Sequence, residues 1–164
     1  MVCLEMVMRI EAPVERCFDL ARCVEVHLLG TERTGEEAVG GVVTGLIGAG
    51  EWVRWRAKHL GVRQELTSRI TGFERPAYFQ DTMEEGAFRF MQHDHFFRTL
   101  ADGATEMRDR FCFSAPVPVV GWIVERVFLR GYMERFLLRR NEILKEVAEG
   151  DGWRAVLGDR TALG

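Results

Sequence analysis

The chain has 164 residues, of which 47% are hydrophobic and 29% are charged, and its formal net charge is −3. This length and composition predict one soluble globular domain with a substantial core. The negative charge argues against a nucleic-acid binder that relies on bulk positive charge. The sequence has no apolar run near the ~20 residues of a membrane span, which argues against stable membrane insertion.

The cysteines do not form a recognisable metal or redox motif. The four of them are Cys3, Cys17, Cys23 and Cys112. None belongs to a CxxC motif or pairs with a histidine at zinc-finger spacing. Glu5 and Arg9 interrupt the short apolar start, so the sequence predicts no signal peptide. We therefore expect reduced thiols in a cytoplasmic protein.

The first third of the chain predicts one strand, two short helices and a glycine-rich segment. Residues 3–10 alternate weakly and contain β-branched side chains, as expected for a strand. Pro13 suits the first turn of a helix over about 13–21, and a second short helix over 24–29 ends at Gly30. Glycines punctuate 31–50, where we expect a strand within 32–45. The next segment is a strand, so these glycines do not match a phosphate-binding loop.

From residue 51 onward the sequence predicts five strands joined by short turns. The strands cover residues 51–59, 63–73, 77–83, 88–99 and 105–115. Short turns between successive strands are typical of an antiparallel meander.

After two prolines, the sequence predicts one long helix over 119–149. Its apolar side chains recur at spacings of three, four and seven: Trp122, Leu129, Met133, Phe136, Ile143 and Val147. At ~1.5 Å per residue the helix would be about 45 Å long, so it needs a large concave partner, which the strands supply. We expect a single domain over 1–150, followed by a short tail over 151–164 that Trp153 could anchor.

The turn between the last two strands suggests their register. If it pairs Phe97 with Met107, His95 lies opposite Asp109, with about 5 Å between the Cβ atoms. Burying either polar group unpaired would cost several kcal/mol. A hydrogen bond between His95 and Asp109 is therefore the natural pairing.

The neighbouring strands add more polar side chains to the same face. If Ile70 pairs with Phe79, Ser68 lies opposite Asp81. Asp81, one strand over from His93, could reach it on the diagonal. His59 lies three strands from His93, roughly 14 Å away at ~4.8 Å per strand. Only strong curvature of the sheet would bring His59 into the same cluster.

One face of the predicted sheet therefore carries the candidate ligand-binding residues, and the long helix adds three. They are Trp55, His59, Phe79, Asp81, Met91, His93, His95, Phe97, Met107, Asp109, Phe111, Trp122, Arg126 and Met133. Three interpretations stay open: a satisfied polar network in a wet cavity, a polar anchor for a largely apolar ligand, or a metal or acid–base site. His95 and Asp109 are the candidate catalytic pair. A lone His-x-His is a weak metal signal, so we predict no metal and no cofactor.

Several motifs resemble those of a known superfamily. They are IEAPVERCF at 10–18, GEWVRWRA at 50–57 and FERPAYF at 73–79, followed by the helix from Val119. With the order of the elements, they resemble the START and birch-pollen-allergen superfamily, often called SRPBCC. Cys17 stands where valine is common in that family. The stretch from Phe79 to His95 resembles a bacterial cyclase-like subgroup.

The resemblance implies an α+β helix-grip fold. In this fold a seven-stranded antiparallel sheet wraps around a long C-terminal helix, two short helices follow the first strand, and sheet and long helix enclose an apolar cavity. Family members bind lipids, sterols, polyketides or plant hormones, and some are aromatase/cyclases or hydroxylase components. No catalytic set carries over residue by residue, and the iron site of the Rieske-oxygenase relatives does not match either.

We therefore predict intracellular binding of a small, largely hydrophobic ligand of lipid, polyketide or other aromatic or isoprenoid type. A cyclase-, aromatase- or hydrolase-like enzyme that uses an Asp/His pair, with His95 and Asp109 as general base, is the alternative. A protein-interaction module without a ligand is a second alternative, and it predicts no cavity large enough for one. The expected partner is a small hydrophobic molecule and not a nucleic acid, and a homodimer stays open.

Overall fold

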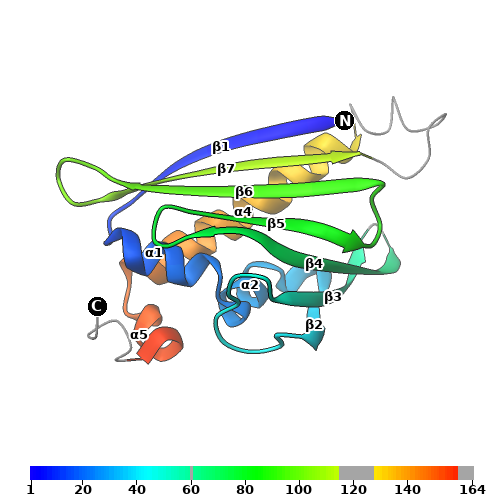
Figure 1. The fold of residues 1–164 in the computed structure, drawn as a ribbon, viewed down its shortest axis with the longest axis horizontal. Helices are drawn as coiled ribbons and strands as arrows, with labels where there is room; N and C mark the ends of the chain where they lie inside the picture. The colour runs from blue at the N-terminus through cyan, green and yellow to red at the C-terminus, as the bar shows by residue number, and fades with distance from the viewer. Residues whose placement is uncertain (60, 115–127, 159–164) are drawn as a thin grey trace.

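The structure is a computed structural model that describes residues 1–59, 61–114 and 128–158. Seven strands form one sheet in the order β1-β7-β6-β5-β4-β3-β2, and every neighbouring pair is antiparallel (Figure 1). The strands are β1 (Val2–Ile10), β2 (Glu37–Gly41), β3 (Trp52–His59), β4 (Val62–Glu74), β5 (Tyr78–Glu85), β6 (Phe90–Thr99) and β7 (Thr105–Ser114). Strands β3 to β7 form the meander that the short turns predict.

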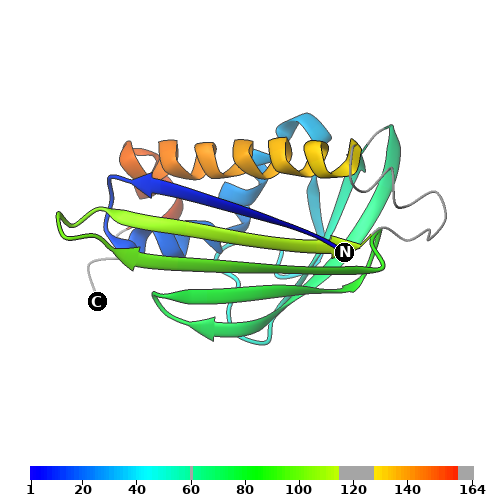
Figure 2. The ribbon, with the colours of Figure 1, turned by 90° about the horizontal axis from the view of Figure 1, so that it is seen from above.

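The helices gather on one side of this sheet. Helices α1 (Val14–Ala21) and α2 (Val24–Gly30) follow β1, and a short 3₁₀ helix, η1 (Glu32–Thr34), precedes β2. The long helix α4 (Arg130–Glu149) runs along one face of the curved sheet (Figure 2) and contacts β1, α1 and α2. This arrangement confirms the predicted helix-grip fold.

The predicted long helix agrees with α4 from Arg130 onward. Trp122 and Arg126, which we expected on its cavity side, lie outside the described residues. Beyond α4, helix α5 (Gly152–Leu157) packs against α1 and α4, and the Arg16 guanidinium lies 4.0 Å from the Trp153 ring centroid. None of the described helices combines the length and the apolarity needed to span a membrane. The domain boundary at residue 150 stays a prediction.

The predicted register is correct between β6 and β7. In β6 and β7, Phe97 pairs with Met107 and His95 pairs with Asp109, as expected. In β4 and β5 the prediction is wrong, because Ile70 pairs with Asp81 and not with Phe79. A bulge between Ile70 and Gly72 adds a residue to β4 and shifts the pairing on either side of it.

Cys3 and Cys112 form a disulfide across β1 and β7. The expectation of reduced thiols is therefore wrong for this pair, whereas Cys17 and Cys23 are free and buried. The two bonded cysteines are 109 residues apart, and only the pairing of the first strand with the last brings them together. Disulfides persist mainly in oxidising compartments. The cytoplasmic location therefore stays a prediction, and reduced cysteines no longer argue for it.

The core has two apolar clusters, and polar side chains lie between them. In the first cluster, Phe18 of α1 contacts Phe79 and Phe97 edge to face at 5.5 and 5.6 Å. The second cluster, which includes Phe111, lies under α4. His95 stacks on Phe79 of the first cluster at 4.1 Å, and the His93 ring meets Phe111 of the second at 5.2 Å.

Candidate functional site

A pocket of about 250 Å³ lies between the sheet and helix α4. Much of its lining is apolar. The apolar side chains come from strands β3, β4, β6 and β7 and from α4, and they include Trp55, Leu66, Met91, Phe111, Met133 and Leu137. Asp81 and His93 add polar groups from β5 and β6. A smaller pocket of about 60 Å³ includes Asp81 and His95 in its lining.

An Asp/His cluster (Asp81, His93, His95 and Asp109) lies beside these pockets. His95 Nδ1 is 2.8 Å from Asp109 Oδ1, and His95 Nε2 is 3.3 Å from Asp81 Oδ1. Asn141 of α4 donates its Nδ2–H to Asp109 Oδ2 at 2.6 Å. The expected hydrogen bond between His95 and Asp109 is therefore present, and it is anchored to the long helix.

The ring nitrogens of His93 are less well hydrogen-bonded than those of His95. Its Nε2 lies 3.7 Å from Asp109 Oδ1, and its Nδ1 lies 4.0 Å from Asp81 Oδ1. Neither distance is that of a hydrogen bond, and Nε2 has no hydrogen-bond partner among the described residues. The side chain is only 4% exposed, so this nitrogen is a buried polar atom that calls for an explanation.

The strand registers account for this arrangement. His93 and His95 are two residues apart on β6, so both point to the same face of the sheet, and their ring centroids are 3.8 Å apart. The register of β6 with β7 sets Asp109 opposite His95, and that of β5 with β6 sets Asp81 directly opposite His93. We expected Asp81 to reach His93 only on the diagonal, whereas the register of β5 with β6, which does not involve the β4 bulge, pairs them directly.

Burial and neighbouring charges give the two histidines of the cluster different protonation states. Burial lowers the pKa of His95, but the charge of Asp109 and the hydrogen bonds to Asp109 and Asp81 outweigh it and raise the pKa to about 9. Burial and the neighbouring charge on His95 lower the pKa of His93 to about 3. Burial alone would raise the pKa of Asp109, yet the charge and hydrogen bond of His95 hold it well below its usual range. At neutral pH a cationic His95 therefore lies between two carboxylates, and His93 is neutral.

A second set of polar groups also lines the larger pocket. The His27 ring stacks on Trp55 at 3.9 Å, and its Nε2 is 3.2 Å from Glu36 Oε2. His59 Nδ1 lies 2.7 Å from the Tyr132 hydroxyl oxygen. His59 therefore lines the pocket without joining the Asp/His cluster, as the strand spacing led us to expect.

The predicted ligand-binding residues fall into four groups. Seven line the larger pocket: Trp55, His59, Asp81, Met91, His93, Phe111 and Met133. Phe79 and His95 line the smaller one. Phe97, Met107 and Asp109 are buried behind the pocket walls. Trp122 and Arg126 lie outside the described residues, and a role for any of the fourteen in binding stays a prediction.

The sequence analysis missed two residues of α4 that complete the site. Arg140, which lines both pockets, belongs to a charged Arg-Arg pair that suggests a solvated face. Asn141 lies on the buried stripe of α4, four residues after Leu137 and three before Leu144. A polar residue on an apolar stripe was the signal that could have found it.

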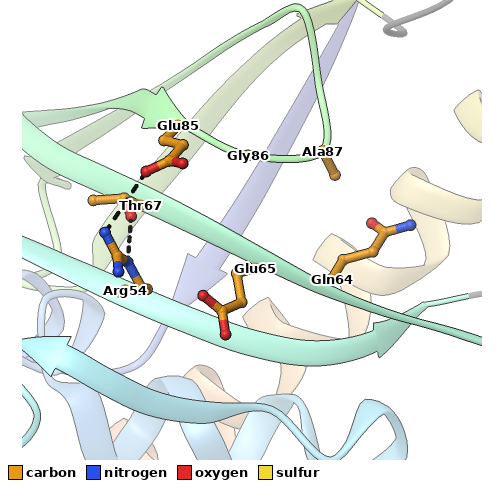
Figure 3. Close-up of a pocket in the computed structure, with 7 residues that line it drawn as sticks. All are labelled: Arg54, Gln64, Glu65, Thr67, Glu85, Gly86 and Ala87. Carbon is orange, nitrogen blue, oxygen red and sulfur yellow. Dashed lines mark hydrogen bonds and ion pairs between the residues drawn. The ribbon is translucent and has the colours of Figure 1, made fainter.

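An outer hollow of about 430 Å³ adjoins the larger pocket and shares Gln64, Glu65 and Ala87 with it (Figure 3). Its Arg54 side chain donates to Thr67 Oγ1 at 3.0 Å and lies 3.6 Å from a Glu85 carboxylate oxygen. These charges are exposed and already paired, so the outer hollow extends the inner pocket towards solvent and is not a separate site.

Comparison with known proteins shows the fold and nothing finer. No family model and no curated protein matches the chain. Among solved structures, the protein TTHA0849 from Thermus thermophilus is 18% identical with a TM-score of 0.72, over 88% of this chain and 95% of that one. The Zhui aromatase/cyclase from Streptomyces sp. R1128 is 17% identical with a TM-score of 0.71, over 90% and 93%. A START superfamily protein from Mycobacterium smegmatis is 14% identical with a TM-score of 0.67, over 90% and 97%. These likenesses confirm the helix-grip fold.

Proposed function

We propose that the chain binds a small, largely hydrophobic molecule with one polar end in the pocket between the sheet and α4. The observation that carries the proposal is the pocket itself, which is mostly apolar and meets the Asp/His cluster at Asp81 and His93. Binding sites for small molecules typically combine apolar walls with a few polar groups that fix orientation. A protein-interaction module with a filled core would not need this space.

The volume of the pocket limits the size of the ligand that can bind. At about 250 Å³ it is just below the ~300–1,000 Å³ of sites for drug-sized ligands. We therefore expect a compact ligand, such as one or two fused rings, and not a long acyl chain. Its polar end would meet Asp81, His93 and Arg140, while its apolar body contacts residues such as Met91 and Met133.

An enzyme that uses the same cluster is the second candidate, and one observation changes the mechanism expected for it. Because the pKa of His95 is raised to about 9, the ring carries a proton at neutral pH. It would then serve as a general acid and not as the general base we expected. The fold that the chain shares with the Zhui aromatase/cyclase is compatible with such a role.

Binding can be tested with a fluorescent hydrophobic probe, anilinonaphthalene sulfonate, and with native mass spectrometry of the purified protein. Met133 faces the pocket, whereas Leu138 on the same helix is 41% exposed. Met133→Trp should fill the pocket and weaken probe binding at least tenfold, and Leu138→Trp should leave it unchanged.

The two variants should have the same circular dichroism spectrum as the parent. If both bind the probe as the parent does, and no small molecule co-purifies with the parent, the binding proposal is wrong. A co-purifying apolar mass that Met133→Trp excludes would identify the ligand class directly.

A further inference from the structure

Asp81, His93 and His95 bring three possible metal-ligand atoms together at one point of the core. One nitrogen from each imidazole and one oxygen from the carboxylate lie within 4.8 Å of one another. The sequence offered only the His-x-His pair on β6. The third group comes from β5, whose register sets Asp81 directly opposite His93.

We propose that Asp81, His93 and His95 bind a divalent first-row transition-metal cation. Two imidazoles and one carboxylate are donors that zinc and neighbouring divalent ions accept, with ligand bonds of ~2.0–2.2 Å. The nitrogen and oxygen atoms are at present 3.3 Å (His95 Nε2 to Asp81 Oδ1) and 4.0 Å (His93 Nδ1 to Asp81 Oδ1) apart. Ligands around one tetrahedral ion are separated by about 3.3 Å at such bond lengths, so His93 Nδ1 would have to move closer to Asp81 Oδ1.

Each of the two rings turns one nitrogen towards Asp81 and the other towards Asp109. His95 turns Nε2 towards Asp81 and Nδ1 towards Asp109, while His93 turns Nδ1 towards Asp81 and Nε2 towards Asp109. Asp109 is thus the carboxylate behind both ligand histidines, and Asn141 fixes its other oxygen. Metal-binding histidines usually donate their second N–H to such a carboxylate, which sets the tautomer and the ring orientation.

The unpartnered nitrogen of His93 is an independent sign that the cluster is incomplete. Its Nε2 is buried with no hydrogen-bond partner among the described residues, a state that costs about 1–3 kcal/mol. A cation on Nδ1 would fix the proton on Nε2 and draw that N–H towards Asp109, now 3.7 Å away. The ligand that completes the coordination would therefore also satisfy this atom.

Charge and access favour a cation at this point. Asp81 and Asp109 supply two negative charges, and the Arg140 guanidinium offsets part of that of Asp81. The metal ion would take the place of the proton that His95 Nε2 carries at neutral pH, and this proton is released to solvent as the ion binds. Asp81 and His93 line the 250 Å³ pocket. The fourth coordination position would therefore face the pocket, as in sites that keep a place for water or for a ligand atom.

The test uses tag-free protein stripped with a chelator and titrated with Zn²⁺ by calorimetry. We expect one ion per chain. His93→Ala and Asp81→Asn should each weaken Zn²⁺ binding by at least a hundredfold. Asp109→Asn, which removes the charge behind both rings, should weaken it ten- to a hundredfold. The matched control is His59→Ala, because His59 lines the same pocket but hydrogen-bonds Tyr132, and it should keep the affinity of the parent.

Two measurements keep the test independent of how well the variants fold. Co²⁺ bound to the parent should give visible absorption bands typical of a four- or five-coordinate ion with nitrogen and oxygen ligands. Diffraction at the zinc edge should place the ion between β5 and β6. No saturable binding by the parent, or equal loss in His59→Ala and His93→Ala, would overturn the proposal. Probe binding by the chelator-treated parent reports on the hydrophobic-ligand proposal separately.

Discussion

The hydrogen bond between Asn141 and Asp109 joins α4 to the sheet, and its removal gives a sharp test of the site. Asn141 Nδ2 donates to Asp109 Oδ2 at 2.6 Å, with the two residues 6% and 1% exposed. Asn141→Ala would leave a buried, charged oxygen with one acceptor site empty. The carboxylate cannot recover this bond from water unless the core opens.

The expected cost follows from two opposing effects. A hydrogen bond to a charged group contributes about 1.5–3 kcal/mol. Alanine is a better helix former than asparagine by about 0.6 kcal/mol, which offsets part of the loss. We therefore expect Asn141→Ala to lower the free energy of unfolding by about 1–2.5 kcal/mol. In a chain of this size each kcal/mol corresponds to ~2–4 °C, so Tm should fall by roughly 2–10 °C.

The assay is urea unfolding at pH 7 followed by circular dichroism, combined with a double-mutant cycle through Asp109→Asn. The matched control is Glu142→Ala, whose side chain is 47% exposed and pairs with the half-exposed Arg139; its effect should stay within about 0.5 kcal/mol. A coupling energy of at least about 1 kcal/mol between positions 109 and 141 is expected. If Asn141→Ala is as stable as the parent, or the two changes are additive, the bond does not hold the site together.

Three further predictions concern the frame of the site. Reducing the Cys3–Cys112 disulfide should lower the free energy of unfolding by about 2–4 kcal/mol, and mass spectrometry after alkylation without reductant should find two free thiols and not four. Burial would raise the pKa of Asp19, but hydrogen bonds from two arginines lower it. The stabilisation is then present above the unfolded-state pKa and lost as pH falls through the folded one, so the stability gap between parent and Asp19→Asn should narrow below about pH 4. Gly41→Ala should destabilise strongly or prevent folding, because at a φ of +70° a Cβ there would overlap the backbone oxygen of Trp52; wild-type stability would contradict this close approach of β2 to β3.

The sequence could predict the parts of the site that depend on local chain geometry. Alternation of side chains assigns His93 and His95 to the inner face, and the short turn before β7 sets His95 opposite Asp109. Both inferences need only neighbouring strands, and both are correct. The sequence could not predict the bulge after Ile70, because one extra residue changes the register without changing the apolar pattern on either side.

Local sequence patterns could not predict the contacts that join distant parts of the chain. The pairing of β1 with β7 brings Cys3 to Cys112, and neither strand shows its partner in its own residues. The position of Asn141 against Asp109 depends on how α4 lies along the sheet. Periodicity finds the buried stripe of a helix, but which sheet residue each position meets is set by the packing of the whole fold.

Hydrogen bonds are unevenly distributed within the Asp/His cluster. His95 and Asp109 are satisfied by each other and by Asn141, and they lie away from the larger pocket. The side chain of Asp81 is 19% exposed, His93 Nε2 has no hydrogen-bond partner among the described residues, and both residues line that pocket.

A network that served only the core would be satisfied throughout, and apolar side chains of the same volume would fill the space at no greater cost. The unsatisfied groups lie instead where a ligand or cation would meet them. The His95–Asp109 pair, the feature most readily found in the sequence, is therefore best understood as the support that orients the cluster. On the binding proposal, Asp81 and His93 are the end of the cluster that a ligand in the pocket would meet.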